Sequence, residues 1–200
     1  MKSIYLDYNA TTPLDPAVRE AMLPFFGDFY GNPSSIHSVG RKVRAFLDDC
    51  RERVAGVWKC KASEVVFTCG ATESINMAIC GTARFLKPKG RHIITSAVEH
   101  HAVLHAIEYL VNKEGFEKTI LPVDVEGMVN PQDLENAICD NTILVSIMAA
   151  NNETGTIQSI SELGSVCRRS GVCFHTDAVQ WFGKEPFDNI MQFNADLVSI

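Results

Sequence analysis

The chain has 200 residues, of which 46% are hydrophobic, and this length suits one domain or slightly more. Its formal net charge of −6 argues against a surface that binds nucleic acid or anionic membranes. No apolar run approaches the roughly 20 residues of a membrane-spanning helix, and Met1–Tyr8 does not resemble a signal peptide. We therefore expect a cytoplasmic protein with neither nucleic acid nor membrane as a partner.

The cysteines are odd in number and include no C-x-x-C pair. Most lie inside apolar helix or strand patterns, which is typical of free thiols that pack as small hydrophobic side chains in a reducing cytosol. Because the paired spacing of zinc sites is absent, we expect neither a disulfide nor a metal site. The seven cysteines are Cys50, Cys60, Cys69, Cys80, Cys139, Cys167 and Cys173.

The first 60 residues favour helices. Asp15 and Pro16 open a predicted helix that runs to about Phe26, and a Gly- and Asn-rich loop follows it. A long amphipathic helix is predicted over Val39–Trp58, because its apolar positions recur at helical spacing.

From there on, short β-branched runs alternate with helical patterns, which predicts βαβ units and an α/β fold with a mostly parallel sheet flanked by helices. The predicted strands are Val65–Thr68, His92–Ser96, Lys118–Val123, Thr142–Met148, Val172–Thr176 and Asp196–Ile200. The predicted helices between them are Ser74–Phe85, His100–Asn112, Pro131–Cys139 and Ser159–Ser170.

The C-terminal run Asp196–Ile200 has the pattern of the start of a buried strand. A natural domain seldom stops inside its own sheet, so this pattern favours a domain that is incomplete at the C-terminus. The alternative is a short edge strand at a true end.

Ligands of open α/β sheets bind at the carboxyl ends of the strands, so the residues after each strand are candidate site residues. Gly70, Ala71 and Thr72 follow the first predicted strand and lead into a helix. Such a turn offers backbone N–H groups and the positive end of a helix dipole to a phosphate. The alternative is an ordinary turn with Thr72 as the N-cap.

A histidine follows the next predicted strand. The imidazole of His100 suits stacking on a flat cofactor ring or acid–base chemistry, although a surface histidine is the alternative. His101 and His105 lie one helical turn apart, but no third ligand is in register, so we do not expect a metal there.

Amide and carboxylate side chains follow two later strands. Asn151 and Asn152 lie after Thr142–Met148, where they form either a turn or the mouth of a cleft. Asp177 ends the strand Val172–Thr176, and a carboxylate at such a place is costly unless it is paired. A protonated pyridine nitrogen is one suitable partner, and an N-cap role is the alternative.

In this order and spacing, the segments G-A-T-E-S, E-H, N-N-E-T-G and H-T-D-A-V-Q resemble the class V aminotransferase family. The resemblance is closest to the cysteine desulfurases of the nitrogen-fixation and iron–sulfur assembly type. Y-L-D-Y-N-A-T-T-P at Tyr5–Pro13 and G-N-P-S-S-I-H-S-V-G at Gly31–Gly40 agree with it. The resemblance extends from Ile4 to Ile200 and implies the large domain of a transferase that depends on pyridoxal 5′-phosphate.

The resemblance implies a role for each strand end. Ala71 and Thr72 would bind the cofactor phosphate. His100 would stack over the pyridine ring and take part in proton transfer. Asp177 would pair with the pyridinium nitrogen and so keep the ring an electron sink.

Further contacts follow from the same resemblance. Gln180 would hydrogen-bond the phenolic oxygen of the ring, and Asn152 would contact both the cofactor and the substrate. The implied division is an N-terminal segment near the substrate entrance at 1–15, helices at 16–60 and the cofactor-binding domain at 61–200, without the small C-terminal domain.

Three family features lie outside these residues. The cofactor-binding lysine of the family motif S-x-H-K would stand about four residues beyond Ile200. The sulfur-accepting cysteine and the arginine that binds the substrate carboxylate would stand further on. We give none of the present cysteines the acceptor role, and we interpret Cys69, beside the phosphate turn, as a packing residue.

The resemblance implies removal of sulfur from L-cysteine, giving L-alanine and an enzyme persulfide for iron–sulfur cluster assembly. It also implies a homodimer and a sulfur-accepting scaffold protein as partners, and we expect no turnover from these 200 residues by themselves. Two alternatives stay open: a related class V lyase, such as one acting on selenocysteine, or a non-catalytic truncated remnant.

Overall fold

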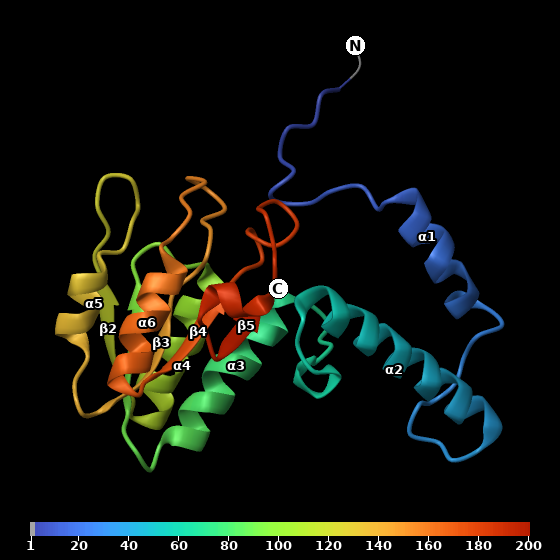
Figure 1. The fold of residues 1–200 in the computed structure, drawn as a ribbon, viewed down its shortest axis with the longest axis horizontal. Helices are drawn as coiled ribbons and strands as arrows, with labels where there is room; N and C mark the ends of the chain where they lie inside the picture. Colours follow the sequence, from blue (N-terminus) through green and yellow to red (C-terminus); the bar gives the residue numbers. More distant parts are fainter. Residues whose placement is uncertain (1–2) are drawn as a thin grey trace. The chain divides into compact units, whose positions relative to one another are not determined.

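The computed structural model describes residues 3–200, and the chain divides into two compact units, Met1–Val66 and Phe67–Ile200. The first unit is helical (Figure 1). It contains α1 (Pro16–Met22), the 3₁₀ helix η1 (Leu23–Phe26), α2 (Ser38–Trp58) and the 3₁₀ helix η2 (Ala62–Glu64).

The helix predicted from Pro16 to Phe26 is present but changes type within its length. Asp15 caps α1, since its side chain accepts the backbone N–H groups of Ala17 and Val18. α1 ends at Met22, and the chain continues as η1. Pro24 explains the change, because proline has no N–H to donate and its ring clashes with the preceding helical turn.

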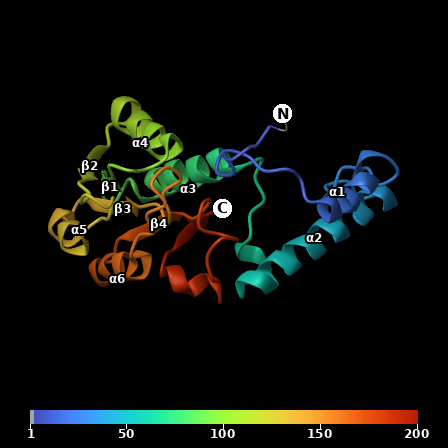
Figure 2. The ribbon, with the colours of Figure 1, turned by 90° about the horizontal axis from the view of Figure 1, so that it is seen from above.

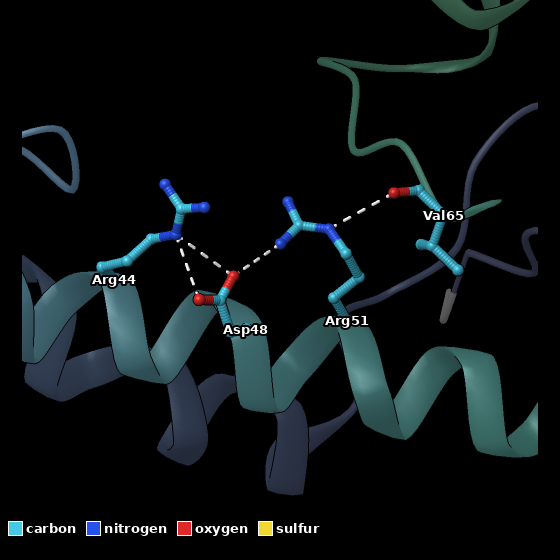
Figure 3. Close-up of polar contacts among 4 residues, drawn as sticks. All are labelled: Arg44, Asp48, Arg51 and Val65. Carbon is cyan, nitrogen blue, oxygen red and sulfur yellow. Dashed lines mark hydrogen bonds and ion pairs between the residues drawn. The ribbon is translucent and has the colours of Figure 1, made fainter. Parts of the chain in front are cut away.

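Helix α2 carries a row of charged contacts that ties it to the end of the first unit. The Asp48 carboxylate accepts from Arg44 Nε at 3.0 Å and from Arg51 Nη1 at 2.9 Å (Figure 3). Arg51 Nε also donates to the carbonyl oxygen of Val65 at 3.3 Å. This segment after η2 is therefore held to the helix by a side chain.

The second unit is built around five parallel strands in the order β2-β1-β3-β4-β5. The connection between each pair of successive strands contains a helix, or, before β5, a 3₁₀ turn. The strands are β1 (His92–Ser96), β2 (Glu117–Leu121), β3 (Thr142–Ser146), β4 (Cys173–Asp177) and β5 (Leu197–Ser199). The helices are α3 (Ala71–Leu86), α4 (His101–Glu114), α5 (Pro131–Ala137), α6 (Ile160–Ser170) and the 3₁₀ helix η3 (Ile190–Phe193).

Helices cover both faces of this sheet, with α3 and α4 on one side and α5 and α6 on the other (Figure 2). Neighbouring residues along a strand enter different cores. Ile93 and Leu144 pack with α3 and α4, whereas Ile94 and Val145 pack with α5 and α6. Coverage on both faces explains why β1 and β3 are buried along their whole length.

The structure confirms the predicted α/β fold and the parallel sheet. Five of the six predicted strands form; the bounds of β1 are as predicted, and no end of the other four shifts by more than two residues. The sixth, Val65–Thr68, is wrong as a strand, because this segment pairs with no other strand among residues 3–200. The helix predicted from Ser74 begins earlier, at Ala71.

Candidate functional site

Because all five strands are parallel, their carboxyl ends lie along one edge of the sheet. The strand order reverses between β1 and β3, since β2 lies to one side and β4 to the other. Such a switch point is where doubly wound sheets bind their ligands, in the crevice outside the strand ends. The segments that follow β1 and β3, which contain His100 and Asn152, meet there.

The first turn of α3 is an uncapped helix N-terminus. Gly70 is its N-cap, and within residues 3–200 this helix start has no side-chain cap. Thr72 lies inside the helix, so the alternative of Thr72 as an N-cap is wrong. The free N–H groups of Ala71 and Thr72, with the helix dipole behind them, suit an anion such as a phosphate.

Cys69, just before this turn, is exposed. The interpretation of Cys69 as a packing residue is therefore wrong. Its backbone N–H donates to the Glu73 carboxylate at 2.5 Å, and this contact closes the turn that leads into α3.

Asp177 ends β4 and is 5% exposed. Its Oδ1 accepts the backbone N–H of Val179 at 3.0 Å, so it caps a turn rather than a helix. Burial raises the pKa of Asp177, while the Val179 N–H and the charge of His100 act in the opposite direction. His100 is therefore near enough to interact with this carboxylate, and a cation at the site would stabilise its charged form.

His100 is the N-cap of α4. Its Nδ1 accepts the backbone N–H of Ala102 at 3.1 Å, so the neutral ring carries its proton on Nε2. The fold thus fixes both the tautomer and one edge of the ring. His101 and His105 stack with ring centroids 5.5 Å apart, and no group of three or more metal-binding side chains occurs within residues 3–200.

Asn152 and Gln180 follow β3 and β4 at the same edge of the sheet. Asn152 Nδ2 donates to Glu153 Oε1 at 2.9 Å, and Gln180 Oε1 accepts from Lys184 Nζ. The neighbouring Asn151 has a structural role. Its Oδ1 accepts the N–H of Glu153 at 2.8 Å, and its Nδ2 donates to a backbone carbonyl of the segment after β1 at 2.9 Å.

Glu99 is a site residue that the sequence reasoning missed. It is 6% exposed, and its Oε1 accepts from Ser96 Oγ at 2.5 Å and from the Met148 N–H at 3.0 Å. Its Oε2 is buried without a hydrogen-bond partner within residues 3–200. Burial, opposed by these two bonds and reinforced by Asp177, raises the pKa of Glu99 to about 8. Like Asp177, Glu99 is a carboxyl group that follows a predicted strand, so the same signal was present in the sequence.

His175 is a second missed residue. It is fully buried on β4, two residues before Asp177, and bonds Ser146 Oγ through Nδ1 at 2.8 Å and Ser199 Oγ through Nε2 at 3.0 Å. Burial lowers its pKa to about 4, so the ring is neutral at pH 7. It appeared in the quoted motif H-T-D-A-V-Q, but nothing in the spacing distinguished it from a core residue.

The donor set fits pyridoxal 5′-phosphate. An uncapped helix N-terminus suits the phosphate dianion, a buried carboxyl group suits a protonated ring nitrogen, and an imidazole with a fixed tautomer lies beside that carboxyl group. The buried Glu99 Oε2, which has no partner among the described residues, adds a polar atom that a bound molecule can satisfy. These features lie in three segments of one unit: the start of α3, the segment between β1 and α4, and the end of β4.

Comparison with known proteins gives a family. The family model described as aminotransferase class-V matches residues 4–200. The chain is 52% identical over 199 residues to cysteine desulfurase IscS of Dictyoglomus turgidum, covering 100% of this chain and 50% of that protein. It is 49% identical to cysteine desulfurase IscS of Methanosarcina thermophila, covering 100% of this chain and 49% of that protein.

Solved structures agree in fold. A NifS-like protein superimposes with a TM-score of 0.92 at 40% identity, covering 98% of this chain and 54% of that one. A structure described as SspA in complex with cysteine has a TM-score of 0.92 at 39% identity, with 98% and 57% covered. The chain therefore spans about half the length of the proteins it resembles.

Proposed function

Because the chain belongs to the class V aminotransferase family, whose members depend on pyridoxal phosphate, we propose that it forms the cofactor-binding part of a cysteine desulfurase. The overall reaction converts L-cysteine and an enzyme thiol into L-alanine and an enzyme persulfide. The observation that carries the proposal is the buried Asp177 beside His100, at one sheet edge with the uncapped start of α3. The neighbour determined with cysteine supports the choice of substrate.

At the phosphate end, the N–H groups of Ala71 and Thr72 donate to the cofactor, and the Thr72 hydroxyl adds a donor. At the other end, Asp177 pairs with the protonated ring nitrogen, and that cation overcomes the burial that otherwise disfavours its charge. Gln180 donates to the phenolic oxygen, and Asn152 contacts the cofactor and the substrate. Pyridoxal phosphate, when bound, supplies an electron sink for the charge that develops on the substrate α-carbon.

His100 has the geometry of a donor toward a bound ligand. Its Nδ1 accepts the Ala102 N–H, so in the neutral ring Nε2–H is the group left to donate a hydrogen bond or a proton. Glu99, which precedes it, bonds both Ser96 and Met148 and so holds the segment after β1 against the segment after β3. His100 is thereby presented from a fixed backbone.

The partners belong to the proposal as well. A homodimer, an iron–sulfur scaffold protein that receives the sulfur and a cytoplasmic location are consistent with relatives named cysteine desulfurase IscS. Among the described residues, no helix is both long and apolar enough to cross a membrane.

The test is a product assay with pyridoxal phosphate and L-cysteine. We expect a protein of the relatives' length that carries these residues to release alanine and transferable sulfur in equal amounts. Asp177→Asn should lower that rate strongly while the protein still folds. The 200 residues alone should not turn over, since no lysine among them stands in an S-x-H-K segment.

Two results would contradict this function. One is catalytic alanine or sulfide production by the 200-residue chain. The other is a longer protein that consumes cysteine without making alanine. Selenocysteine in a parallel reaction separates the two class V lyases, because a selenocysteine lyase would process it and leave cysteine unchanged.

A further inference from the structure

One chain of hydrogen bonds crosses the sheet just below the candidate site. Ser74 Oγ, in the first turn of α3, donates to Ser199 Oγ on β5 at 2.9 Å. Ser199 Oγ contacts His175 Nε2 on β4 at 3.0 Å, and His175 Nδ1 contacts Ser146 Oγ on β3 at 2.8 Å. Thr95 Oγ1 on β1 completes the row by donating to the Ser146 carbonyl oxygen at 2.9 Å.

This chain of bonds has a single direction. A neutral imidazole has one donor and one acceptor nitrogen, and the buried His175 is neutral at pH 7. Because Ser74 donates to Ser199, the Ser199 hydroxyl proton is available for His175 Nε2. His175 Nδ1–H then donates to Ser146 Oγ. Every link is therefore satisfied without a charge, and the row stays intact across the neutral pH range.

Two members of the row, Ser74 and His175, connect it to the two ends of the proposed cofactor site. Ser74 follows Ala71 and Thr72 in the same helical turn, and its N–H donates to the Gly70 carbonyl oxygen at 3.1 Å. His175 and Asp177 are two residues apart on β4, so their side chains leave the same face of the sheet. The row therefore links the turn that would hold the phosphate to the strand that carries Asp177.

We propose that Ser74, Ser199 and His175 are positioning residues that set the span between the first turn of α3 and Asp177, and so select the phosphorylated form of the cofactor. None of the three needs to touch the ligand. The inference rests on the proposed function, since it assumes that the phosphate binds at α3. It adds a cause for the preference for the phosphorylated ligand. If the distance between the first turn of α3 and Asp177 is fixed, a ligand can contact both only when it carries the phosphate as well as the ring.

The test compares pyridoxine 5′-phosphate with pyridoxine, two ligands that differ only in the phosphate and have no aldehyde to react with a lysine. Both affinities are measured by titration calorimetry on the purified apo-protein. Ser74→Ala is the main variant, because Ser74 is only half-buried and alanine favours a helix. Ser161→Ala, an exposed serine in the first turn of α6, is the matched control.

We expect Ser74→Ala to weaken the affinity for pyridoxine 5′-phosphate about five- to tenfold, which is the size of effect that the loss of one hydrogen bond produces. The affinity for pyridoxine should stay nearly unchanged. Ser199→Ala should weaken its binding at least as much, because Ser199 also contacts His175 Nε2. The double variant should lose no more affinity than Ser199→Ala alone, because the Ser74 hydroxyl acts through Ser199. Ser161→Ala should match the parent protein for both ligands.

Three outcomes would overturn the inference. If Ser74→Ala and Ser199→Ala bind both ligands like the parent, the row has no part in binding, although phosphate selectivity in the parent still supports the proposed function. If the affinities for both ligands fall equally, the serines stabilise the fold as a whole and do not select the phosphorylated ligand. If the parent itself does not prefer the phosphorylated ligand, the proposed function fails together with the inference.

Discussion

At the scale of single residues, the site holds two buried carboxyl groups that the fold treats differently. Asp177 accepts a backbone N–H and interacts with the charge of His100, whereas Glu99, buried to a similar extent, interacts with the negative charge of Asp177. A negative charge on Asp177 disfavours a second negative charge on Glu99 unless a cation lies between the two carboxyl groups. With its pKa raised to about 8, Glu99 is the one that keeps its proton at pH 7.

This difference predicts a pH dependence of folding. A carboxyl group with a raised pKa in the folded state stabilises the protein below its unfolded pKa, and the stabilisation is lost as pH rises to the folded pKa. His175 has the opposite effect, because its pKa is lowered to about 4 and it destabilises the fold as pH falls below 6.5. Of these two groups, only Glu99 therefore changes the free energy of unfolding between about pH 6.5 and 8.

We expect the free energy of unfolding to fall over that window by up to about 1 kcal/mol per pH unit. Glu99→Gln, which imitates the protonated acid, should remove most of this slope, and urea titrations at pH 6.5 and 8 measure it. Glu162→Gln, an exposed glutamate on α6, is the control and should keep the slope. An unchanged slope in Glu99→Gln would show that Glu99 is already ionised in the folded protein.

At the scale of elements, helix packing decides whether replacing a helical glycine by alanine stabilises or destabilises the fold. Gly81 in α3 has open space where a Cβ would stand, while a Cβ on Gly164 in α6 would collide with the carbonyl oxygen of Asn194. Both glycines lie inside helices, where alanine is intrinsically better by about 0.5–1 kcal/mol. The same substitution should therefore have opposite signs at the two positions.

We expect Gly81→Ala to raise the free energy of unfolding by about 0.5–1 kcal/mol, and Gly164→Ala to lower it by more than about 1 kcal/mol. Urea titration of the two variants beside the parent measures both. Stabilisation by Gly164→Ala would mean that α6 and the segment at Asn194 are not in the close contact described here.

The elements also mark what the sequence could predict. The apolar runs at β1 and β3 and the alternation with helices were sufficient for the parallel sheet, because burial on both faces leaves a clear pattern. Val65–Thr68 has the composition of a strand, but a strand also needs a partner, and composition does not name one. The start of α3 was placed too late, because the small residues before Ser74 read as a loop.

At the scale of the whole molecule, the chain comprises two compact units and spans about half the length of its curated relatives. The sequence led to Ala71, Thr72, His100, Asn152, Asp177 and Gln180 because the family's motifs were recognised. It did not lead to Glu99 or His175. Glu99 follows a predicted strand as Asp177 does, so its position was a usable signal, but its bond to the Met148 N–H depends on the assembled sheet. His175 has no such signal, because its partners Ser146 and Ser199 lie on neighbouring strands that are distant in the sequence.

The central claim is that Asp177 faces the ring nitrogen of a phosphorylated pyridine whose phosphate lies on α3. The most direct measurement is the ¹⁵N NMR shift of ring-labelled pyridoxal phosphate bound to the protein, at a pH where the free cofactor has lost its ring proton. We expect a protonated nitrogen in the parent protein and an unprotonated one in Asp177→Asn. A ring nitrogen that is unprotonated in the parent, or unaffected by Asp177→Asn, would contradict the account.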